Sequence, residues 1–394
     1  MSNELKNAQI ATTIKNTRKR RQIQTVQVRE IKLNPTKEQA TLLNRVFLEA
    51  KWLRNDALSH GIRGYVAGKT VQVKNRDGKL ETRVLTTIGS QIKQSVISSL
   101  VQDARTLAKK KKRGYKVGKL KFVRQVNSVD LKQYKSTYNI FPQENAVKIQ
   151  NIGTKIRAYG LNQLCDIDGR ELANAKLVKK PSGFYLKITT FINTDVWLEL
   201  DKKRFNPGTS IGIDMGVKTH LTLSDGRKFN VLVPETKRLK RLQKKLHRQY
   251  TKGEKSKNYL KTLNLLKREY EKMDNLKDEK SRKIVSELLK YEDIYFQDEN
   301  LSAWKVLWGK RLHHSVLGRV KTLLVNHPRA HMLDKYMATT QTCPECHKKT
   351  KHSLDKRVYV CSYCGYSNDR DIHAAQNMMW MYNVPRDAGE LTPK

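Results

Sequence analysis

The sequence predicts a multidomain α/β protein, and three observations lead to that fold class. Short β-rich runs recur between about residues 115 and 200, and helical patterns occupy much of 36–114 and 234–290. Strand-like runs carrying carboxylates lie on either side of the second helical region, and a block of paired cysteines follows them. At 394 residues the chain is long enough for two or three domains with cores of their own.

Basic residues exceed acidic residues along nearly the whole chain. Lys and Arg number 79 against 37 Asp and Glu, which gives a formal net charge of +42 at pH 7. Such a charge destabilises a compact state by self-repulsion unless a polyanion neutralises it, and long nucleic acid is the natural partner. Membrane binding is disfavoured because no run of 18 or more apolar residues occurs, and the N-terminus lacks the apolar core of a signal peptide. We therefore expect a soluble, cytoplasmic, nucleic-acid-binding protein.

The first hundred residues begin with a polar segment and continue as a strand and helices. Residues 1–24 end in a cluster of Arg and Lys, which predicts a flexible basic arm that touches phosphates without specificity. Residues 25–33 alternate as a strand does. Thr36, followed three residues later by Gln39, forms a capping-box pattern that starts a helix. A Gly- and Lys-rich stretch and a second helix complete the helical region, 36–114.

A basic and aromatic surface is expected where the second helix ends. A run of cations closes that helix before Gly114, and aromatic residues interleaved with lysines follow it. Stacking on bases while gripping phosphates requires such a combination, although some of these aromatic residues can equally belong to a core. The candidate nucleic-acid-binding residues are Lys109, Lys110, Lys111, Lys112, Arg113, Tyr115, Phe122 and Tyr134, with Tyr138 in the same pattern.

Evenly spaced short strands after residue 115 predict a small antiparallel barrel. A turn signal at Pro181-Ser182-Gly183 separates the last two of them. The expected strands are 119–123, 146–149, 175–178 and 184–191.

Residues 211–216 read as a strand whose apolar positions share one face, with Asp214 on the other. Gly212 and Gly216 leave the Asp214 side open, so that a metal ion and a phosphate can approach the backbone. A hairpin signal follows at Asp225-Gly226. A carboxylate in the middle of the first strand of such a meander is typical of RNase H-like folds.

The region between this meander and the cysteines contains helices and a second strand bearing acids. Residues 234–290 predict a basic helical pair, for which a coiled-coil dimerisation element is the alternative. Residues 293–300 read as a strand that puts Asp298 on one face and Gln297 and Glu299 on the other. A helix around 312–325 and a strand near 330–333 are expected next.

Four of the five cysteines form two C-x₂-C pairs separated by fourteen residues. This spacing predicts a zinc ribbon in which four thiolates close the coordination shell, so the site is structural and leaves no position for catalytic water. The zinc ligands are Cys343, Cys346, Cys361 and Cys364.

A third acid-bearing segment follows the cysteines directly. Asp371 opens a helix whose packing face includes Ala374 and Ala375. Three acids from distant segments that meet at one sheet edge can hold two divalent ions for an in-line phosphodiester displacement. Hard oxygen ligands select Mg²⁺ or Mn²⁺ over zinc.

Taken together, these motifs closely resemble those of the TnpB family of transposon-associated RNA-guided DNA nucleases, which are related to compact type V CRISPR effectors. The resemblance is specific across roughly 205–380. It is weaker before that region. The matching segments are 34–39, 183–185, Ile211–Gly216, Gln297–Asn300, Thr339–Cys346 with Cys361 and Cys364, and Asp369–Asn377.

The resemblance implies a domain organisation and partners. The partners would be a guide RNA and double-stranded target DNA, with a short motif beside the target read by the protein and base pairing reading the rest. A monomer in the prokaryotic cytoplasm, associated with the nucleoid, is expected. The implied domains are a basic flexible arm (1–24), a wedge-like β-barrel (25–35 and 115–204), an inserted helical recognition domain (36–114), a RuvC-like nuclease (205–338 and 367–394) and an inserted zinc ribbon (339–366).

The same resemblance assigns the metal-binding acids of a Mg-dependent endonuclease. Asp214 would be the first and Asp371 the third, with Asp369 a weaker candidate for that place. Where the family has Glu-Asp-Leu-Asn this chain has Gln297-Asp-Glu-Asn, so Glu299 is taken as a relocated ligand about 7 Å along the strand.

Other interpretations remain open at this point. If Glu299 does not replace the missing acid, the protein is a nuclease-dead, RNA-guided DNA-binding repressor. A compact type V CRISPR effector would carry the same residues. A plain RNA-binding zinc-ribbon protein would leave the arrangement of Asp214 and Asp371 unexplained.

Overall fold

The chain divides into two compact units, Met1–Trp197 and Leu198–Lys394. Residues 383–394, which the sequence analysis assigns to the nuclease, and residues 1 and 2 of the expected arm lie outside the described residues. The computed structural model describes residues 3–75, 77–165, 169–205, 207–217, 220–250, 256–353 and 356–382.

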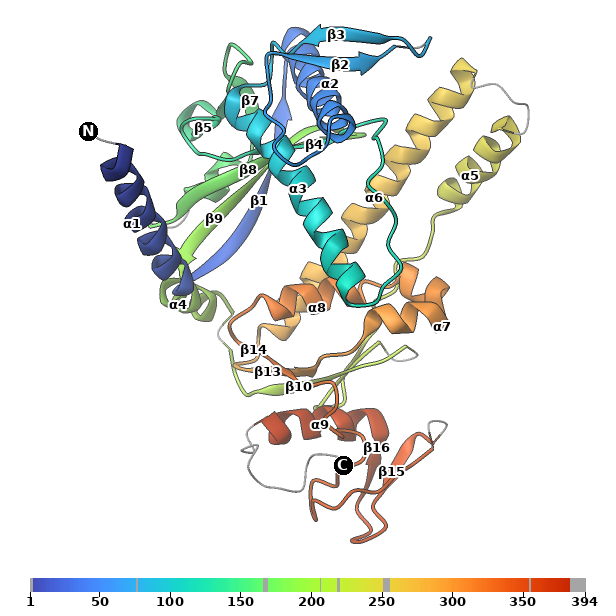
Figure 1. Ribbon diagram of the computed structural model, residues 1–394. Helices are drawn as coiled ribbons and strands as arrows, with labels where there is room; N and C mark the ends of the chain where they lie inside the picture. Colours follow the sequence, from blue (N-terminus) through green and yellow to red (C-terminus); the bar gives the residue numbers. More distant parts are fainter. Residues whose placement is uncertain are drawn as a thin grey trace. The chain divides into compact units, whose positions relative to one another are not determined.

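The first unit is built on a seven-stranded antiparallel sheet (Figure 1). Its order is β4-β8-β9-β1-β7-β6-β5, and its two edge strands, β4 and β5, are joined by only residues 132–137. The sheet is therefore nearly closed. The strands are β1 (Gln24–Asn34), β4 (Ser128–Leu131), β5 (Tyr138–Phe141), β6 (Ala146–Ile149), β7 (Ile156–Tyr159), β8 (Glu171–Lys180) and β9 (Gly183–Asn193).

The strands expected at 146–149, 175–178 and 184–191 are confirmed, whereas the one at 119–123 is wrong. The backbone of Val123 instead pairs with a side chain. Its N–H donates to Asn55 Oδ1 at 2.9 Å, and its carbonyl accepts from Asn55 Nδ2 at 3.0 Å. A side-chain amide thus satisfies the polar groups that a neighbouring strand would otherwise have satisfied.

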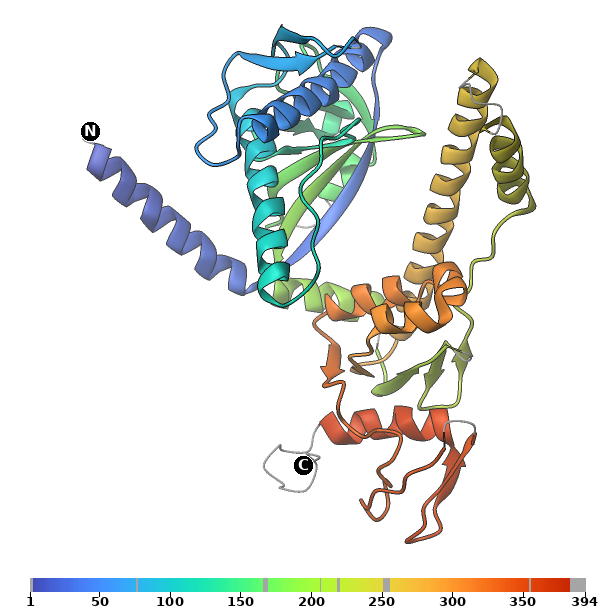
Figure 2. The ribbon, with the colours of Figure 1, turned by 45° about the vertical axis from the view of Figure 1, so that its right-hand side comes forward.

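Two long helices lie against one face of this sheet (Figures 1 and 2). Helix α2 (Lys37–Ser59) begins at Thr36 with both hydrogen bonds of the expected capping box. Helix α3 (Ser90–Lys112) follows a hairpin of β2 (Thr70–Lys74) and β3 (Leu80–Val84). Short 3₁₀ helices lie at η1 (Pro142–Glu144) and η2 (Leu161–Leu164), and α4 (Thr194–Phe205) spans the boundary of the units. Apolar side chains of α2 and of the strands form one continuous core.

The N-terminal segment differs from the expected flexible arm, because residues Asn3–Gln22 form helix α1. No glycine or proline interrupts this stretch. At its C-terminal end, Arg20 and Arg21 form ion pairs with Glu171 of β8, each at 3.0 Å.

The second unit contains a five-stranded mixed sheet in the order β12-β11-β10-β13-β14. The first two neighbouring pairs are antiparallel, and β10–β13 and β13–β14 are parallel. Helices α6 and α8 cover one face and α9 the other (Figures 1 and 2). The strands are β10 (Ile211–Met215), β11 (Leu221–Leu223), β12 (Lys228–Phe229), β13 (Ile294–Gln297) and β14 (Ala330–Leu333).

The expected strands at 211–216, 293–300 and 330–333 are confirmed, with β13 ending at Gln297. The helical pair is confirmed too, and its buried leucines pack into the core of this unit. The helix expected around 312–325 is instead two helices that meet near Ser315. The helices are α5 (Lys237–Tyr250), α6 (Lys257–Leu288), α7 (Leu301–His314), α8 (Leu317–Val325) and α9 (Arg370–Tyr382); β15 (Val358–Val360) pairs with β16 (Ser367–Asp369) near the cysteines.

Within the described residues, no helix combines the length and the apolar character needed to cross a membrane.

Candidate metal centres

Strand alternation places Asp214 on the α9 face of the second sheet. Ile211 and Ile213 are buried in the core beneath α6 and α8, so the even-numbered positions face α9. Gly212 is required there for a reason different from the expected one. A Cβ atom at Gly212 would lie 1.8 Å from the carbonyl oxygen of Ala375. The glycine therefore makes room for α9 to pack against β10, and not for a metal or a phosphate.

Parallel pairing brings a second carboxylate to the same end of the sheet. Ile213 of β10 is in register with Phe296 of β13, so the carboxyl ends of both strands lie at the same edge of the sheet. Asp214 lies near the end of β10, and Glu299 lies two residues beyond the end of β13. The carboxyl ends of neighbouring parallel strands are where open α/β sheets bind ligands.

The two aspartates at the start of α9 have different roles. Asp369 accepts hydrogen bonds from the backbone N–H groups of Asp371 (2.9 Å) and Ile372 (3.2 Å), so it caps the helix, and it also pairs with Lys228. Asp371 is half-buried instead, with Arg370 at 3.2 Å and Arg357 at 3.5 Å. Capping thus occupies Asp369, the weaker candidate.

Asp214, Glu299 and Asp371 all line one pocket of about 440 Å³. Trp304 and Trp308 of α7 contribute to its wall. The sequence does not single out these residues, because two tryptophans at helical spacing give no signal of their own. Helix α7 is kinked at Trp308, whose φ of −125° and ψ of 35° are not helical.

Two acids of this pocket have a raised pKa. Burial, together with the charges of Asp371 and Glu299, raises the pKa of Asp214 to about 7. Burial also raises the pKa of Glu299, and the nearby Lys321 only partly opposes this. Among the described residues, the carboxylates of Asp214 and Glu299 have neither a hydrogen-bond donor nor an ion-pair partner. Unpartnered carboxylate oxygens that repel one another are a donor set that fits a hard divalent cation.

The other two members of the Gln297–Asn300 run face elsewhere. Asp298 pairs with Lys321 at 2.5 Å and does not line the pocket of the three acids. Gln297 is buried, and hydrogen bonds to the segment that follows β14 occupy its amide.

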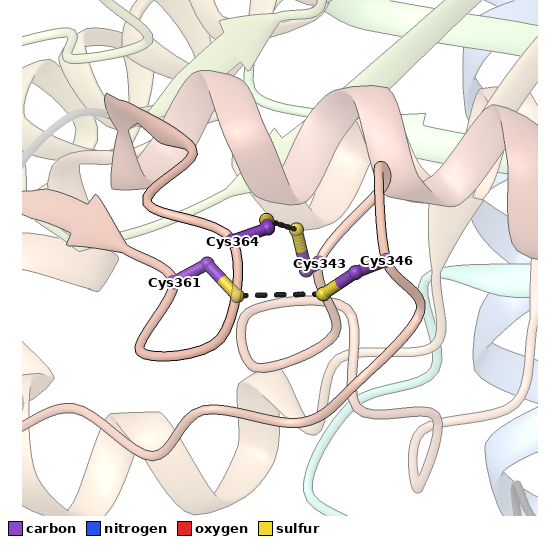
Figure 3. Close-up of side chains that lie close together, drawn as sticks. All are labelled: Cys343, Cys346, Cys361 and Cys364. Carbon is purple, nitrogen blue, oxygen red and sulfur yellow. Dashed lines mark hydrogen bonds between the residues drawn. The ribbon is translucent and has the colours of Figure 1, made fainter.

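The four cysteines form a separate cluster (Figure 3). Their sulfur atoms all lie within 4.8 Å of one another, with Cys343–Cys364 at 3.6 Å and Cys346–Cys361 at 3.5 Å. Although burial raises the pKa of Cys361, backbone N–H groups of Cys364 and Tyr363 outweigh it and lower that pKa to about 6. Four convergent thiols are compatible with structural zinc. Across the described residues, this is the one group of three or more potential ligands that is so tightly gathered.

The expected nucleic-acid surface of the first unit is exposed only in part. The cationic run Lys109–Arg113 at the end of α3 is exposed, as are Tyr115 and Phe122, which are 65% and 62% accessible. Tyr134 is half-buried, with its ring 5.4 Å from that of Tyr138, and Tyr138 belongs to the core. The alternation of lysines and aromatic residues did not distinguish exposed rings from buried ones.

Two family models match the second half of the chain. One, OrfB_IS605, described as a probable transposase, matches residues 193–294, and the other, a Cas12f1-like TNB domain, matches residues 328–378. The first match includes Asp214, and the second includes the four cysteines and Asp371. Both matches support membership of the TnpB family. No curated protein matches it.

The coarse architecture agrees with these two matches. A mixed α/β chain with a nearly closed sheet and a four-cysteine cluster fits the organisation of TnpB and Cas12 proteins. The family suggests nuclease activity, with guide RNA and DNA as partners. Glu299 lies between the two matched regions, so its role depends on its position in the pocket.

Proposed function

We propose that this TnpB protein is an RNA-guided DNA endonuclease whose active site is the pocket formed by Asp214, Glu299 and Asp371. One observation carries the proposal. Three carboxylates from two strand ends and a helix start line a single pocket, and two of them have no partner among the described residues.

The order of the second sheet supports a RuvC-like, RNase H-like nuclease domain. Three antiparallel strands, consecutive in the chain, are followed by two strands parallel to the first, in the spatial order 3-2-1-4-5. The first acid then lies on the central strand. We assign this domain to residues 205–338 and 367–394, and the zinc ribbon to 339–366. The wedge-like barrel would be 25–35 and 115–204, and the recognition domain 36–114.

Glu299 also fits the family pattern directly once the register is moved by two residues. Glu299-Asn300-Leu301-Ser302 agrees with Glu-Asp-Leu-Asn at the Glu and the Leu, so in this register no ligand needs to be relocated. This alignment removes the motive for a nuclease-dead repressor, since that interpretation depended on Gln297 standing where the acid belongs.

The residues in and around the pocket would have distinct roles in this reaction. Asp214, Glu299 and Asp371 would hold Mg²⁺ or Mn²⁺, which supplies an activated water and charge stabilisation at the scissile phosphate. Asp369 caps α9 and so fixes the start of the helix, whose first turn contains Asp371. Gly212 permits the close approach of α9 that keeps Asp371 near Asp214. Arg370 and Arg357 lie against Asp371 and orient its carboxylate.

Recognition would be divided between the protein and its guide. Guide RNA would pair with one strand of double-stranded target DNA, and the N-terminal half would read a short adjacent motif. The exposed cations Lys109–Arg113 would bind phosphates, and Tyr115 and Phe122 would stack on bases. A compact type V CRISPR effector would use the same residues, and only neighbouring genes separate the two.

The test is cleavage of plasmid DNA by protein co-expressed with its native flanking locus. The target carries a guide-matched sequence beside a randomised flank, and buffers with and without Mg²⁺ are compared. Magnesium-free buffer is used in place of EDTA, which would also strip the cysteine cluster. We expect metal-dependent cleavage that Asp214→Asn, Glu299→Gln and Asp371→Asn each abolish.

Asp298→Asn is the matched control, because Asp298 neighbours Glu299 but pairs with Lys321 outside the pocket. Cleavage that survives Glu299→Gln but not Asp298→Asn would contradict the assignment of the second acid. Guide-dependent binding by wild-type protein without any cleavage would instead make the protein a repressor.

A further inference from the structure

Gln297 is the last residue of β13, and its side chain forms hydrogen bonds to the segment that leads to the cysteines. Gln297 is 6% exposed. Its Nε2 donates to the backbone carbonyls of Asp334 (3.0 Å) and Met337 (2.7 Å). Its Oε1 accepts from Thr339 Oγ1 at 3.0 Å. Both amide protons and the carbonyl oxygen of this side chain are therefore used.

Only an amide can make this set of contacts. A glutamate of the same size has no proton to donate when ionised, and its carboxylate would face two carbonyl oxygens in a buried site. A methionine would fill the volume but lose all three hydrogen bonds: the Thr339 hydroxyl would lose its acceptor, and the carbonyls of Asp334 and Met337 would keep only their backbone donors. Gln297 is consequently not a degenerate metal ligand.

The network continues from Gln297 to helix α9. Thr339, which donates to Gln297, accepts at its backbone carbonyl from Asn377 Nδ2 at 2.7 Å. The same Nδ2 donates to the carbonyl of Thr342 at 2.6 Å. Thr342 directly precedes Cys343, and Asn377 lies on the helix that Asp371 begins. Thr339, Thr342 and Asn377 are all buried.

A second contact links α9 to the other cysteine pair. The ring of His373 stacks on that of Tyr359 at 3.8 Å, with an angle of 12° between the planes. His373 Nε2 lies 3.2 Å from Asn377 Nδ2, and Tyr359 is two residues before Cys361. Helix α9 is thus held by residues next to both halves of the cysteine cluster.

We propose that Gln297 is a positioning residue that couples the four-cysteine cluster to the acid pocket. This inference rests on the proposed metal-binding role of Asp214, Glu299 and Asp371. Glu299 follows Gln297 by two residues, and Asp371 precedes Asn377 on one helix, so the two ends of the network fix two of the three acids. Metal occupancy of the cysteine cluster fixes the hydrogen-bond network of Gln297, Thr339 and Asn377, and this network fixes the positions of the acids. By thermodynamic linkage, metal binding at the acids influences the cluster to the same extent.

The experiment reads this coupling from the cysteine side, where cleavage plays no part. Co²⁺ replaces the structural metal in the full-length protein, and its thiolate absorption bands are recorded as Mg²⁺, which is spectroscopically silent, is added. Mn²⁺ affinity is measured in parallel by the electron paramagnetic resonance of free Mn²⁺. Wild type is compared with Gln297→Met, Gln297→Glu, Asp214→Asn and the charge control Gln243→Glu on α5.

We expect Mg²⁺ to shift the cobalt spectrum of wild type and of Gln243→Glu, but not that of Asp214→Asn or of either Gln297 variant. Mn²⁺ affinity should fall by about 10- to 100-fold in both Gln297 variants, as is typical when a residue that orients metal ligands is removed. Gln297→Glu is the most discriminating variant, because it adds a carboxylate and is nevertheless expected to weaken Mn²⁺ binding.

Gln297→Glu binding Mn²⁺ as tightly as wild type, or more tightly, would overturn the inference and make position 297 a ligand position. Mn²⁺ binding by wild type without any spectral change would overturn the coupling and leave the proposed function intact. Absence of Mn²⁺ binding by wild type would overturn both. Gln297 variants that still show the Mg²⁺-induced shift would reduce Gln297 to a packing role.

Discussion

Asp201 and Asp214 are two aspartates of the same unit, both withdrawn from solvent, in opposite electrostatic states. Asp201 is buried beside Arg329, whose Nε and Nη2 lie 3.0 and 2.6 Å from one carboxylate oxygen, and His327 approaches the same oxygen at 3.3 Å. Burial alone would raise the pKa of Asp201, but His327 and Arg329 outweigh it and lower that pKa. Asp214 has no such partner, and its pKa is raised to about 7.

The difference separates a structural carboxylate, Asp201, from Asp214, which we propose to be functional. A charge fully paired inside the protein contributes to folding and is not free to bind anything else. A charge left without a partner destabilises the folded protein, and such strain is expected where a ligand supplies the missing counter-charge. Each of the following changes tests whether this distinction holds.

The largest effect is expected for Asp214→Asn, which should reduce guided cleavage by at least about 1,000-fold. The loss of several kcal/mol of metal-dependent transition-state stabilisation corresponds to that factor. Single-turnover cleavage of plasmid DNA measures it. The variant should stay folded, and in Mg²⁺-free buffer near neutral pH it should be more stable than wild type, because the uncharged amide removes an unpartnered charge. Circular dichroism checks that it is folded.

Asp201→Asn should have the complementary effect and destabilise the fold by about 3–5 kcal/mol, because it leaves Arg329 buried without its counter-charge. Urea denaturation of the full-length protein measures the change. Residual cleavage by the folded fraction should stay close to that of wild type. A loss of specific activity equal to that of Asp214→Asn would contradict the division into structural and functional acids.

The two aspartates also predict opposite pH dependences in Mg²⁺-free buffer. Asp214 releases its proton near pH 4 when unfolded and near pH 7 when folded, so wild type should lose stability relative to Asp214→Asn as the pH rises from about 4 to about 7. The slope for one proton is at most about 1.4 kcal/mol per pH unit. Asp201, whose pKa is lowered, contributes stability that is lost as the pH falls below about 4. Urea midpoints of both variants across this range measure the two signs.

Gly212→Ala tests the contact that brings the acids together. Its Cβ would lie 1.8 Å from the carbonyl oxygen of Ala375, so α9 must shift, at a cost of about 1–3 kcal/mol and with a loss of Mn²⁺ affinity. Gly318→Ala on α8 is the matched control, since its Cβ would meet Leu301 at an ordinary 3.8 Å. That change should be neutral or stabilising by about 0.5–1 kcal/mol. Equal effects of the two substitutions would contradict the close approach of α9.

The smallest effect is expected for exposed charges that have neither burial nor a fixed partner. Changing Lys109–Lys112 to glutamine should leave folding intact and lower the salt dependence of nucleic-acid binding. Each lysine–phosphate ion pair that the substitutions remove reduces the slope of log affinity against log salt by about 0.7–0.9. Fluorescence anisotropy with guide RNA at several salt concentrations measures the slope. Lys283→Gln on α6, where the lysine pairs with Glu279, serves as the control.

The sequence by itself determined much of this protein. Strand alternation placed Asp214 on the face opposite Ile211 and Ile213, and the paired cysteine spacing identified the four cysteines whose thiols converge. The capping box at Thr36 fixed the start of α2. These features depend on neighbours within a few residues, where backbone periodicity and local hydrogen bonds decide the outcome.

Tertiary structure decided what distant residues do to one another. Gln297 read as a missing acid because its partners at 334–339 are some forty residues away in the chain. Gly212 read as an opening for a metal because the carbonyl of Ala375 could not be foreseen. The contrast between Asp201 and Asp214 was equally hidden. A carboxylate carries no mark of the charge that will lie beside it, and burial together with partners brought by packing sets its pKa.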